Sequence, residues 1–254
     1  MRTSAVIAVA AKLSVLTIFA AGSAAAAEIK VLASNAVKTV LEELAPKFEK
    51  ATEHKLNITF GVGAQLQANI EKGETFDLAI LAASSVDTLI KQDKLTAATR
   101  ANIARSSVGV AVKKGAPKPD IGTTDAFKRA MLDAKSICYV EQGASGIYLK
   151  GLFERMGLAA DLKPKTKLLP GSNPAANAVA NGECEIGMTQ ISEILPYAGA
   201  ALVGPLPADI QLYTVFATAV GSRAKEGEAA KALIKFLTAP DAAAVLKAKG
   251  LEPG

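Results

Sequence analysis

Short polar residues stand where the apolar runs of this sequence end. Gly, Ser, Asn and Gln occupy nearly every such turn, as in Ser34-Asn35 and in Gly143-Ala144-Ser145-Gly146. Where a turn of this kind leads into a helix, unpaired backbone N–H groups and the positive end of the helix dipole lie beside it, which suits an oxyanion or a carboxylate. Because the same residue types are ordinary helix caps, capping without a ligand explains each turn when it is taken alone.

The sequence offers little for covalent or metal chemistry. His54 is the single histidine and stands between Glu53 and Lys55, so we expect it in a solvent-exposed turn rather than in a triad or a zinc site. Residues 143–147 are similar to a nucleophile elbow but lack its closing Gly, and residues 222–225 match Ser-x-x-Lys without the companion motifs. We therefore expect no metal and no cofactor.

Two cysteines, Cys138 and Cys184, are present. In an exported chain they would meet an oxidising compartment and form a disulfide. Two buried free thiols are the alternative, because free Cys is commonly buried. In neither case do we expect a catalytic role.

Composition and charge argue for a folded domain that does not bind nucleic acid. Half of the 254 residues are apolar, 21% are charged and 5% are aromatic, which excludes a disordered chain, a collagen and a small disulfide scaffold. The formal net charge is +5 and falls to +3 without Arg2 and Lys12. This excess is weak and the chain has no Trp, so it offers neither a strong grip on phosphates nor a surface for stacking bases.

Residues 1–27 have the pattern of an export signal. Arg2 and Lys12 supply positive charge, residues 13–21 form a short apolar run, and Ala25-Ala26-Ala27 provides small residues before a cleavage site at Glu28. The run is too short for a bilayer-spanning helix, which needs about 20 apolar residues. The sequence therefore predicts a periplasmic protein, with a retained membrane anchor as the alternative.

The mature chain alternates short apolar runs with amphipathic stretches, which predicts βα units and a mainly parallel sheet. Val37, Val40, Leu41, Leu44 and Phe48 have helical spacing, and Pro46 is expected to kink or divide that helix. A Pro-rich basic stretch at 113–119 has the composition of a linker. Further strands are expected at residues 29–33, 56–60, 76–81, 107–112, 137–140, 166–169, 185–189 and 210–220, and the last two helices at residues 228–237 and 241–249. In such folds a ligand usually lies beyond the carboxyl ends of the strands.

Several segments resemble the solute-binding proteins of ABC importers, especially the branch that includes the molybdate-binding proteins. The resemblance spans the mature chain and is carried by Phe60-Gly61-Val62-Gly63-Ala64-Gln65-Leu66, Phe76-Asp77-Leu78-Ala79-Ile80 and Asn181-Gly182-Glu183-Cys184-Glu185-Ile186-Gly187. It implies an α/β protein with the two-lobed type II periplasmic-binding-protein fold, each lobe a mainly parallel sheet flanked by helices. Residues 28–108 and 208–254 would form lobe 1, and residues 109–207 would form lobe 2. It also implies a monomer that binds a small anion between its lobes and presents it to a membrane permease.

The expected ligand is an organic carboxylate or an oxyanion, and the cleft residues differ from those of the molybdate binders. Molybdate binders present a serine in each of the first two cleft turns, where this sequence has Ala36 and Gly63, and a tyrosine where it has Gln190. The remaining hydroxyls and amides can bond the oxygens of a larger and flatter anion, such as an organic carboxylate. They are Ser34, Asn35, Gln65, Ser84, Ser145, Tyr148, Ser172, Asn173 and Gln190.

A second resemblance leads to an enzyme on the same scaffold. Residues 115–121, Ser145-Gly146-Ile147-Tyr148-Leu149 and Gln190-Ile191-Ser192-Glu193 are similar to the branch that includes aconitate isomerase. The cleft would then hold a tricarboxylate while a base moves an allylic proton, with Tyr148, Glu141 and Lys38 as candidates. The structural alternatives are an interlobe Tyr, a solvated Glu and an exposed Lys. A receptor is the leading hypothesis, and fold alone does not separate it from an isomerase.

Overall fold

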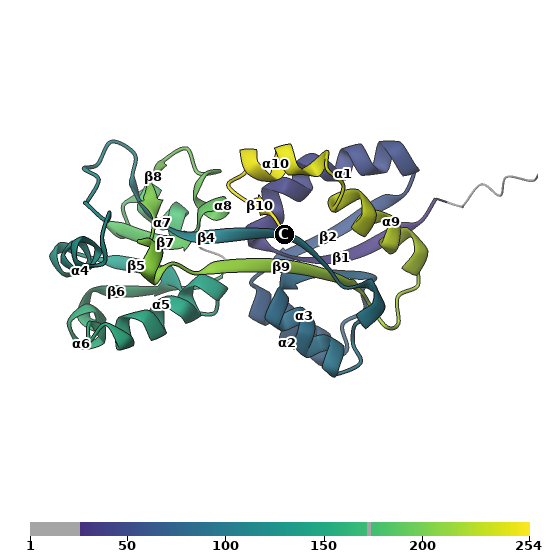
Figure 1. Ribbon diagram of the computed structural model, residues 1–254, viewed down its shortest axis with the longest axis horizontal. Helices are drawn as coiled ribbons and strands as arrows, with labels where there is room; N and C mark the ends of the chain where they lie inside the picture. The colour runs from purple at the N-terminus through teal and green to yellow at the C-terminus, as the bar shows by residue number, and fades with distance from the viewer. Residues whose placement is uncertain (1–25, 172–173) are drawn as a thin grey trace, which may run out of the picture.

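Strands and helices alternate along the chain, as the apolar pattern predicts (Figure 1). The computed structural model describes residues 26–171 and 174–254. Nearly all of the expected export signal lies outside the described residues, as do Ser172 and Asn173.

Lobe 1 is built on three parallel strands, β1 (Glu28–Ser34), β2 (Lys55–Gly61) and β3 (Leu78–Ala82), in the order β2-β1-β3. Successive residues of β1 point to opposite faces, so Val31 and Leu32 belong to two different cores. One face is covered by α1 (Lys38–Thr52), α9 (Gly227–Leu237) and α10 (Ala242–Ala248), and the other by α2 (Gly63–Glu71) and α3 (Ala83–Lys91). A single turn of 3-10 helix, η1 (Asn35–Val37), joins β1 to α1.

Pro46 does not divide the helix, because α1 runs as one helix from Lys38 to Thr52 through Pro46. Leu44 and Phe48 are buried on either side of it, whereas Pro46 itself is exposed. Water can therefore reach the carbonyl that Pro46 leaves without a donor, and the buried face holds the helix together.

His54 is another correction to the sequence-based expectation, because it is half-buried rather than exposed. Its Nδ1 accepts a hydrogen bond from the backbone N–H of Ala27 at 3.1 Å, and its ring lies 6.1 Å from that of Phe48. The histidine helps to fix the start of β1 and takes no part in the cleft.

Lobe 2 repeats the arrangement with β5 (Ile137–Val140), β6 (Thr166–Leu169) and β7 (Ile186–Gln190), which run parallel in the order β7-β5-β6. The helices α4 (Thr124–Asp133), α5 (Ala144–Arg155) and α6 (Ala159–Leu162) share a core on one face. On the other face, α7 (Ala175–Asn181) and α8 (Ile191–Ile194) share a second core. α5 begins at Ala144, directly after the turn that follows β5.

Two long antiparallel strands join the lobes in the middle of Figure 1. β4 (Ala101–Lys113) pairs with β9 (Tyr213–Val220) along its first half, and with β7 and β8 (Ala200–Pro205) along its second. β4 is longer than the strand expected at 107–112, and β9 is shorter than expected because a 3-10 turn, η4 (Ala208–Ile210), precedes it. The basic stretch at 113–119 is the loop that follows β4. The two-lobed α/β fold is therefore confirmed, and we keep as a proposal that the chain changes lobe near residues 108 and 208.

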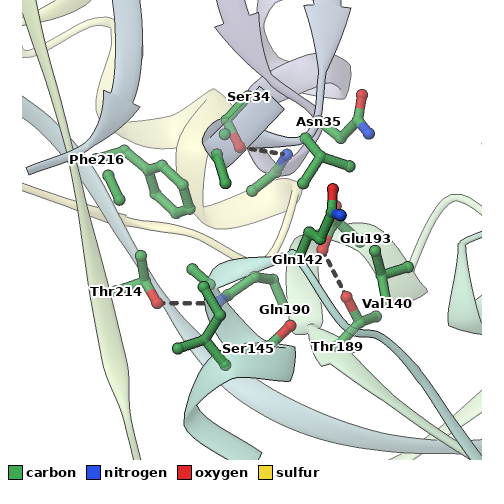
Figure 2. Close-up of a pocket in the computed structure, with 18 of the residues that line it drawn as sticks. Ser34, Asn35, Val140, Gln142, Ser145, Thr189, Gln190, Glu193, Thr214 and Phe216 are labelled. Atoms are coloured by element: carbon green, nitrogen blue, oxygen red, sulfur yellow. Dashed lines mark hydrogen bonds between the residues drawn. The ribbon is translucent and has the colours of Figure 1, made fainter. Parts of the chain in front are cut away.

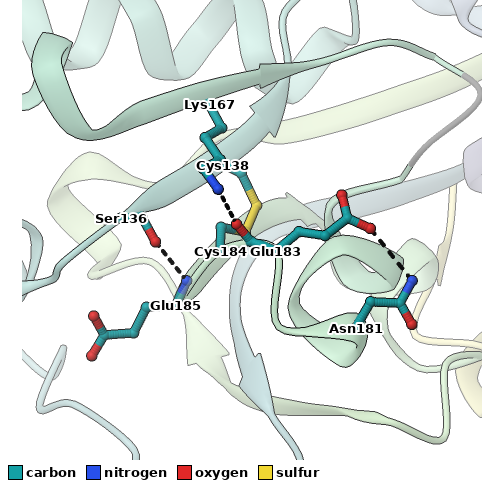
Figure 3. Close-up of a disulfide and its surroundings, with 7 residues drawn as sticks. All are labelled: Ser136, Cys138, Lys167, Asn181, Glu183, Cys184 and Glu185. Atoms are coloured by element: carbon teal, nitrogen blue, oxygen red, sulfur yellow. Dashed lines mark hydrogen bonds between the residues drawn. A yellow bond between two sulfur atoms is a disulfide. The ribbon is translucent and has the colours of Figure 1, made fainter.

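Cys138 and Cys184 form a disulfide, which settles the alternative that the sequence left open (Figure 3). Cys138 lies in β5 and Cys184 stands just before β7, so the bond links two neighbouring strands of lobe 2. Both cysteines are buried.

Candidate functional site

A cavity of about 470 Å³ lies between the lobes. Lobe 1 lines it with the turns that follow β1, β2 and β3, and lobe 2 lines it with the turns that follow β5 and β7. The carboxyl ends of the parallel strands therefore meet at one place, as expected for a ligand site in this fold class. A second hollow of about 660 Å³ adjoins the cavity and shares Asn35, Gln142 and Glu193 with it.

The structure gathers most of the candidates from the sequence around the cavity. The candidates among its lining residues are Ser34, Asn35, Ala36, Gly63, Ser84, Ser145, Tyr148 and Gln190. Gln65 and Lys38 line the adjoining hollow instead, where the Lys38 Nζ lies 3.7 Å from Glu42 Oε1. Glu141 is exposed and is not among the lining residues, so it does not fit the role of a base in the cavity.

On the lobe 1 side, Ser34 shapes the entry of the chain into η1. Its Oγ accepts a hydrogen bond from the backbone N–H of Ala36 at 3.4 Å. The hydroxyl oxygen thus caps η1, while its O–H group is left to donate elsewhere. Asn35 and Ala36 then present their side chains and the start of η1 to the cavity.

On the lobe 2 side, α5 begins directly at the cavity wall. No side chain caps its first turn, whose N–H groups have no partner within the helix. A Cβ on Gly146 would lie 1.9 Å from the carbonyl oxygen of Val140, so only Gly allows α5 to start this close to β5. This close approach keeps Ser145, which is 4% exposed, against the cavity.

Tyr148 lines the cavity, but its hydroxyl is already engaged. The Oη donates a hydrogen bond to the carbonyl oxygen of Ile210 at 2.8 Å, and the Arg155 guanidinium lies 5.5 Å from the centre of its ring. The side chain therefore ties α5 to the segment before β9.

Gln190 is the most deeply buried amide of the cavity, with 2% of its surface exposed. Its Nε2 donates a hydrogen bond to Thr214 Oγ1 at 2.9 Å (Figure 2). Its Oε1 has no hydrogen-bond partner among the described residues. Since the Thr214 hydroxyl can also donate, turning the amide over would leave the NH₂ group unpaired instead, so the amide keeps one free group in either orientation.

Glu193 is the residue that reasoning from the sequence missed. It lines both the cavity and the adjoining hollow, and its Oε2 accepts a hydrogen bond from Thr189 Oγ1 at 2.6 Å (Figure 2). Burial raises the pKa of the Glu193 carboxyl, while the bonds from the Thr189 hydroxyl and the Gln190 backbone act in the opposite direction. The signal for Glu193 is its position three residues after the end of β7, which places it in the first turn of α8.

The charged side chains that line the cavity are unusual for a site that would hold an anion. Among the described lining residues of the cavity there is no Lys or Arg, and Glu193 is the only carboxyl. Hydroxyls, amides and backbone N–H groups must therefore hold any anion. Within the described ranges, no three His, Cys, Asp or Glu side chains are grouped to bind a metal ion, and none of the helices there is long and apolar enough to cross a membrane.

Similarities to known proteins extend over nearly the whole chain. The sequence matches the family described as bacterial extracellular solute-binding protein over residues 29–252. It is 35% identical over 231 residues to an aconitate isomerase from a Pseudomonas species, covering 89% of this chain and 87% of that protein. It is 27% identical over 235 residues to the molybdate-binding protein ModA of Azotobacter vinelandii, covering 90% of this chain and 91% of that protein. The solved periplasmic molybdate-binding protein of Azotobacter vinelandii matches with a TM-score of 0.76 at 21% identity, covering 89% of this chain and 99% of that one.

Proposed function

The chain belongs to the bacterial extracellular solute-binding protein family, and we propose that it captures a small organic anion with more than one carboxylate between its lobes. In this proposal the closed complex is delivered to the membrane permease of an ABC importer. Membership of the family supports a periplasmic location and the binding of a small anion. We expect the protein to act as a monomer, exported by the signal at residues 1–27.

One observation carries the choice of ligand class. The polar groups of the cavity stand at separate turns, with Asn35 in one lobe and Ser145 and Gln190 in the other, while Ala36 and Gly63 bring no hydroxyl. A compact tetrahedral oxyanion needs its donors gathered around one point. An anion with two or three carboxylates can instead reach donors in both lobes, and about 470 Å³ lies within the range of roughly 300–1,000 Å³ for small-molecule pockets.

Closure of the lobes is the mechanism we propose for capture. A ligand that contacts both lobes binds the closed form more tightly and shifts the population toward it. The closed form then offers the permease a surface composed of both lobes. The contacts that α8 of lobe 2 makes with η1 of lobe 1 are consistent with a closed arrangement.

Thermal unfolding with a panel of anions tests the ligand class. A ligand at 100 times its Kd adds about 2.7 kcal/mol to the unfolding free energy, because it binds only the native state. We expect citrate, cis-aconitate or trans-aconitate to raise the Tm, and molybdate and sulfate to leave it unchanged. A shift with molybdate or sulfate alone would reject the carboxylate proposal.

An isomerase is the second candidate, and Glu193 in the cavity together with the 35% identical aconitate isomerase favours it. In an allylic transfer, a base removes a proton from the methylene carbon and the C–H electron pair forms a new double bond. The old π pair then takes the same proton at the other end of the allyl group. Glu193 can accept and return that proton, so the step needs no cofactor.

Proton NMR of cis-aconitate or trans-aconitate with the protein tests this candidate. The enzyme would interconvert the two isomers, and Glu193→Gln would slow the reaction by about 10²-fold or more. Binding without interconversion would reject the isomerase and keep the receptor.

A further inference from the structure

We propose that Glu193 shares a proton with a carboxylate of the bound ligand, so that capture of the anion is coupled to proton uptake. This inference rests on the proposed function, since it assumes a carboxylate ligand in the cavity. Glu193 is the only carboxyl among the described lining residues of the cavity. In its protonated form it would assist the binding of an anion.

The position of Glu193 brings it into contact with any ligand that fills the site. The side chain lines the cavity and the adjoining hollow, and it remains partly accessible although protein surrounds it. Thr189 is 4% exposed, and its hydroxyl holds Glu193 Oε2 through a hydrogen bond. The carboxyl is therefore held in place at the surface of the cavity.

The charges around Glu193 leave few ways to neutralise it. The main elements packed against α8 are β4, β7, β8, α7 and η1. Of these, only β4 contains a Lys, Arg, Asp, Glu or His. In β4, Arg105 pairs with Glu252, and the Lys113 Nζ lies 3.7 Å from the position of a Cβ on Gly182, at the end of α7.

Three titratable groups share the adjoining hollow with Glu193. Lys38 and Glu42 form an ion pair at 3.7 Å. Burial, followed by the negative charge of Glu193, raises the pKa of the Tyr197 hydroxyl, so this group stays neutral. An ionised Glu193 would thus repel an anion in the cavity, whereas a protonated Glu193 donates a hydrogen bond to it.

Gln190 supplies an independent sign that a ligand completes this part of the site. Its amide is 2% exposed, lines the same cavity and keeps one polar group without a partner among the described residues. Buried polar groups in native proteins are nearly always paired. A carboxylate that accepts from Glu193 can also accept from Gln190 if its amide is turned so that the NH₂ group faces the cavity.

The sign of the pH dependence follows from the protonation of Glu193. Burial raises the pKa of this carboxyl in the free protein, and a neighbouring anion raises it further. Between the pKa of Glu193 in the free protein and its higher pKa in the complex, each ligand therefore takes up to one proton, and the Kd rises by up to about tenfold per pH unit. If the chain also isomerises its ligand, Glu193 must be ionised to accept the allylic proton, so turnover would rise with pH while affinity falls.

Isothermal titration calorimetry with trans-aconitate tests the proposal. The wild type is titrated in two buffers of different ionisation enthalpy between about pH 6 and 9, which gives the number of protons taken up per ligand. In the wild type, we expect the number of protons taken up per ligand to rise toward one as the pH increases. In Glu193→Gln, only the protons that the ligand itself takes up should remain. Glu141→Gln removes an exposed carboxylate that lines neither the cavity nor the adjoining hollow and serves as the matched control, which should behave as wild type.

The outcomes separate the inference from the proposed function. Tight binding with the same proton uptake in wild type and Glu193→Gln would overturn the inference and leave carboxylate capture standing. No heat with trans-aconitate, citrate or cis-aconitate in the wild type would reject the proposed function, and the inference with it. If Glu193→Gln does not fold, infrared difference spectra of the wild type decide the matter, since the inference requires a protonated-carboxyl band to appear on ligand addition.

Discussion

Ser145 and Asn35 line the cavity from opposite lobes, at the start of α5 and of η1. If their polar groups bond the ligand, replacing either by Ala removes one hydrogen bond from the complex. We expect Ser145→Ala and Asn35→Ala each to weaken binding by about 1–2 kcal/mol. Calorimetric titration measures the loss, and thermal unfolding without ligand checks that folding is barely affected. Unchanged affinity in both variants would remove these residues from the site.

The sequence predicts that candidate residues gather where the ends of parallel strands place them, and the structure brings these candidates together. Ser34, Ser84 and Ser145 follow strands whose carboxyl ends meet in the fold, and they line the cavity as that logic requires. Glu193 was missed because its burial depends on how α8 packs against β4, β8 and η1, which no local pattern encodes. Lys38 and Gln65 were displaced to the adjoining hollow because their helices turn them away from the cavity.

At the scale of elements, the start of α5 depends on Gly146. A methyl group there would lie 1.9 Å from the Val140 carbonyl oxygen, so the helix would have to move away from β5. We expect Gly146→Ala to lower the unfolding free energy by about 1–3 kcal/mol and to weaken ligand binding as well. Gly151→Ala in the same helix is the control, since its Cβ would meet only the flexible Arg155 side chain. Equal stability of the two variants, measured by urea denaturation, would argue against this role.

The disulfide holds β5 beside the start of β7 and closes a loop with a sequence separation of 46. Replacing both Cys138 and Cys184 by Ala should lower the unfolding free energy by about 2–4 kcal/mol, because the unfolded chain gains freedom. Neither cysteine lines the cavity, so ligand affinity should stay within a few-fold of wild type. Denaturation with and without a reductant provides the measurement. Full reduction of the wild type should cost a similar free energy, and a wild-type stability that reduction leaves unchanged would contradict this interpretation.

The elements that the sequence predicted are those with a regular apolar pattern, such as β1, β5 and α1. β8 and the short β10 (Glu252–Pro253) were not predicted, because both gain their strand conformation by pairing with β4 rather than from their own pattern. At Pro46 the local rule allows a division of the helix that the structure does not show, because the buried face of α1 keeps it as one helix.

For the whole molecule, we expect the proposed closure to require the close contact between the lobes at Gly171. A Cβ on Gly171 would lie 2.3 Å from Val62 Cγ2, so a larger residue would hold the lobes apart. We expect Gly171→Ala to weaken ligand binding several-fold, or roughly 1 kcal/mol, because the closed form becomes less favourable. In small-angle X-ray scattering, ligand-bound Gly171→Ala should have a larger radius of gyration than the ligand-bound wild type.

Gly204→Ala adds the same methyl group where its nearest contact is Ile121 Cδ1, at an ordinary 3.7 Å, and is the matched control. It should close and bind as wild type does. If Gly171→Ala also closes fully and binds with wild-type affinity, the Val62 side chain moves aside easily. The contact between Gly171 and Val62 then does not limit closure.

A crystal structure grown with trans-aconitate tests most directly whether the cleft is a polycarboxylate site. We expect the anion in the cavity, with its carboxylates bonded to Ser145, Gln190 and Glu193 on one side and to the turn at Asn35 on the other. An empty cavity at saturating ligand, or an anion bound to one lobe at a distance from these residues, would contradict it.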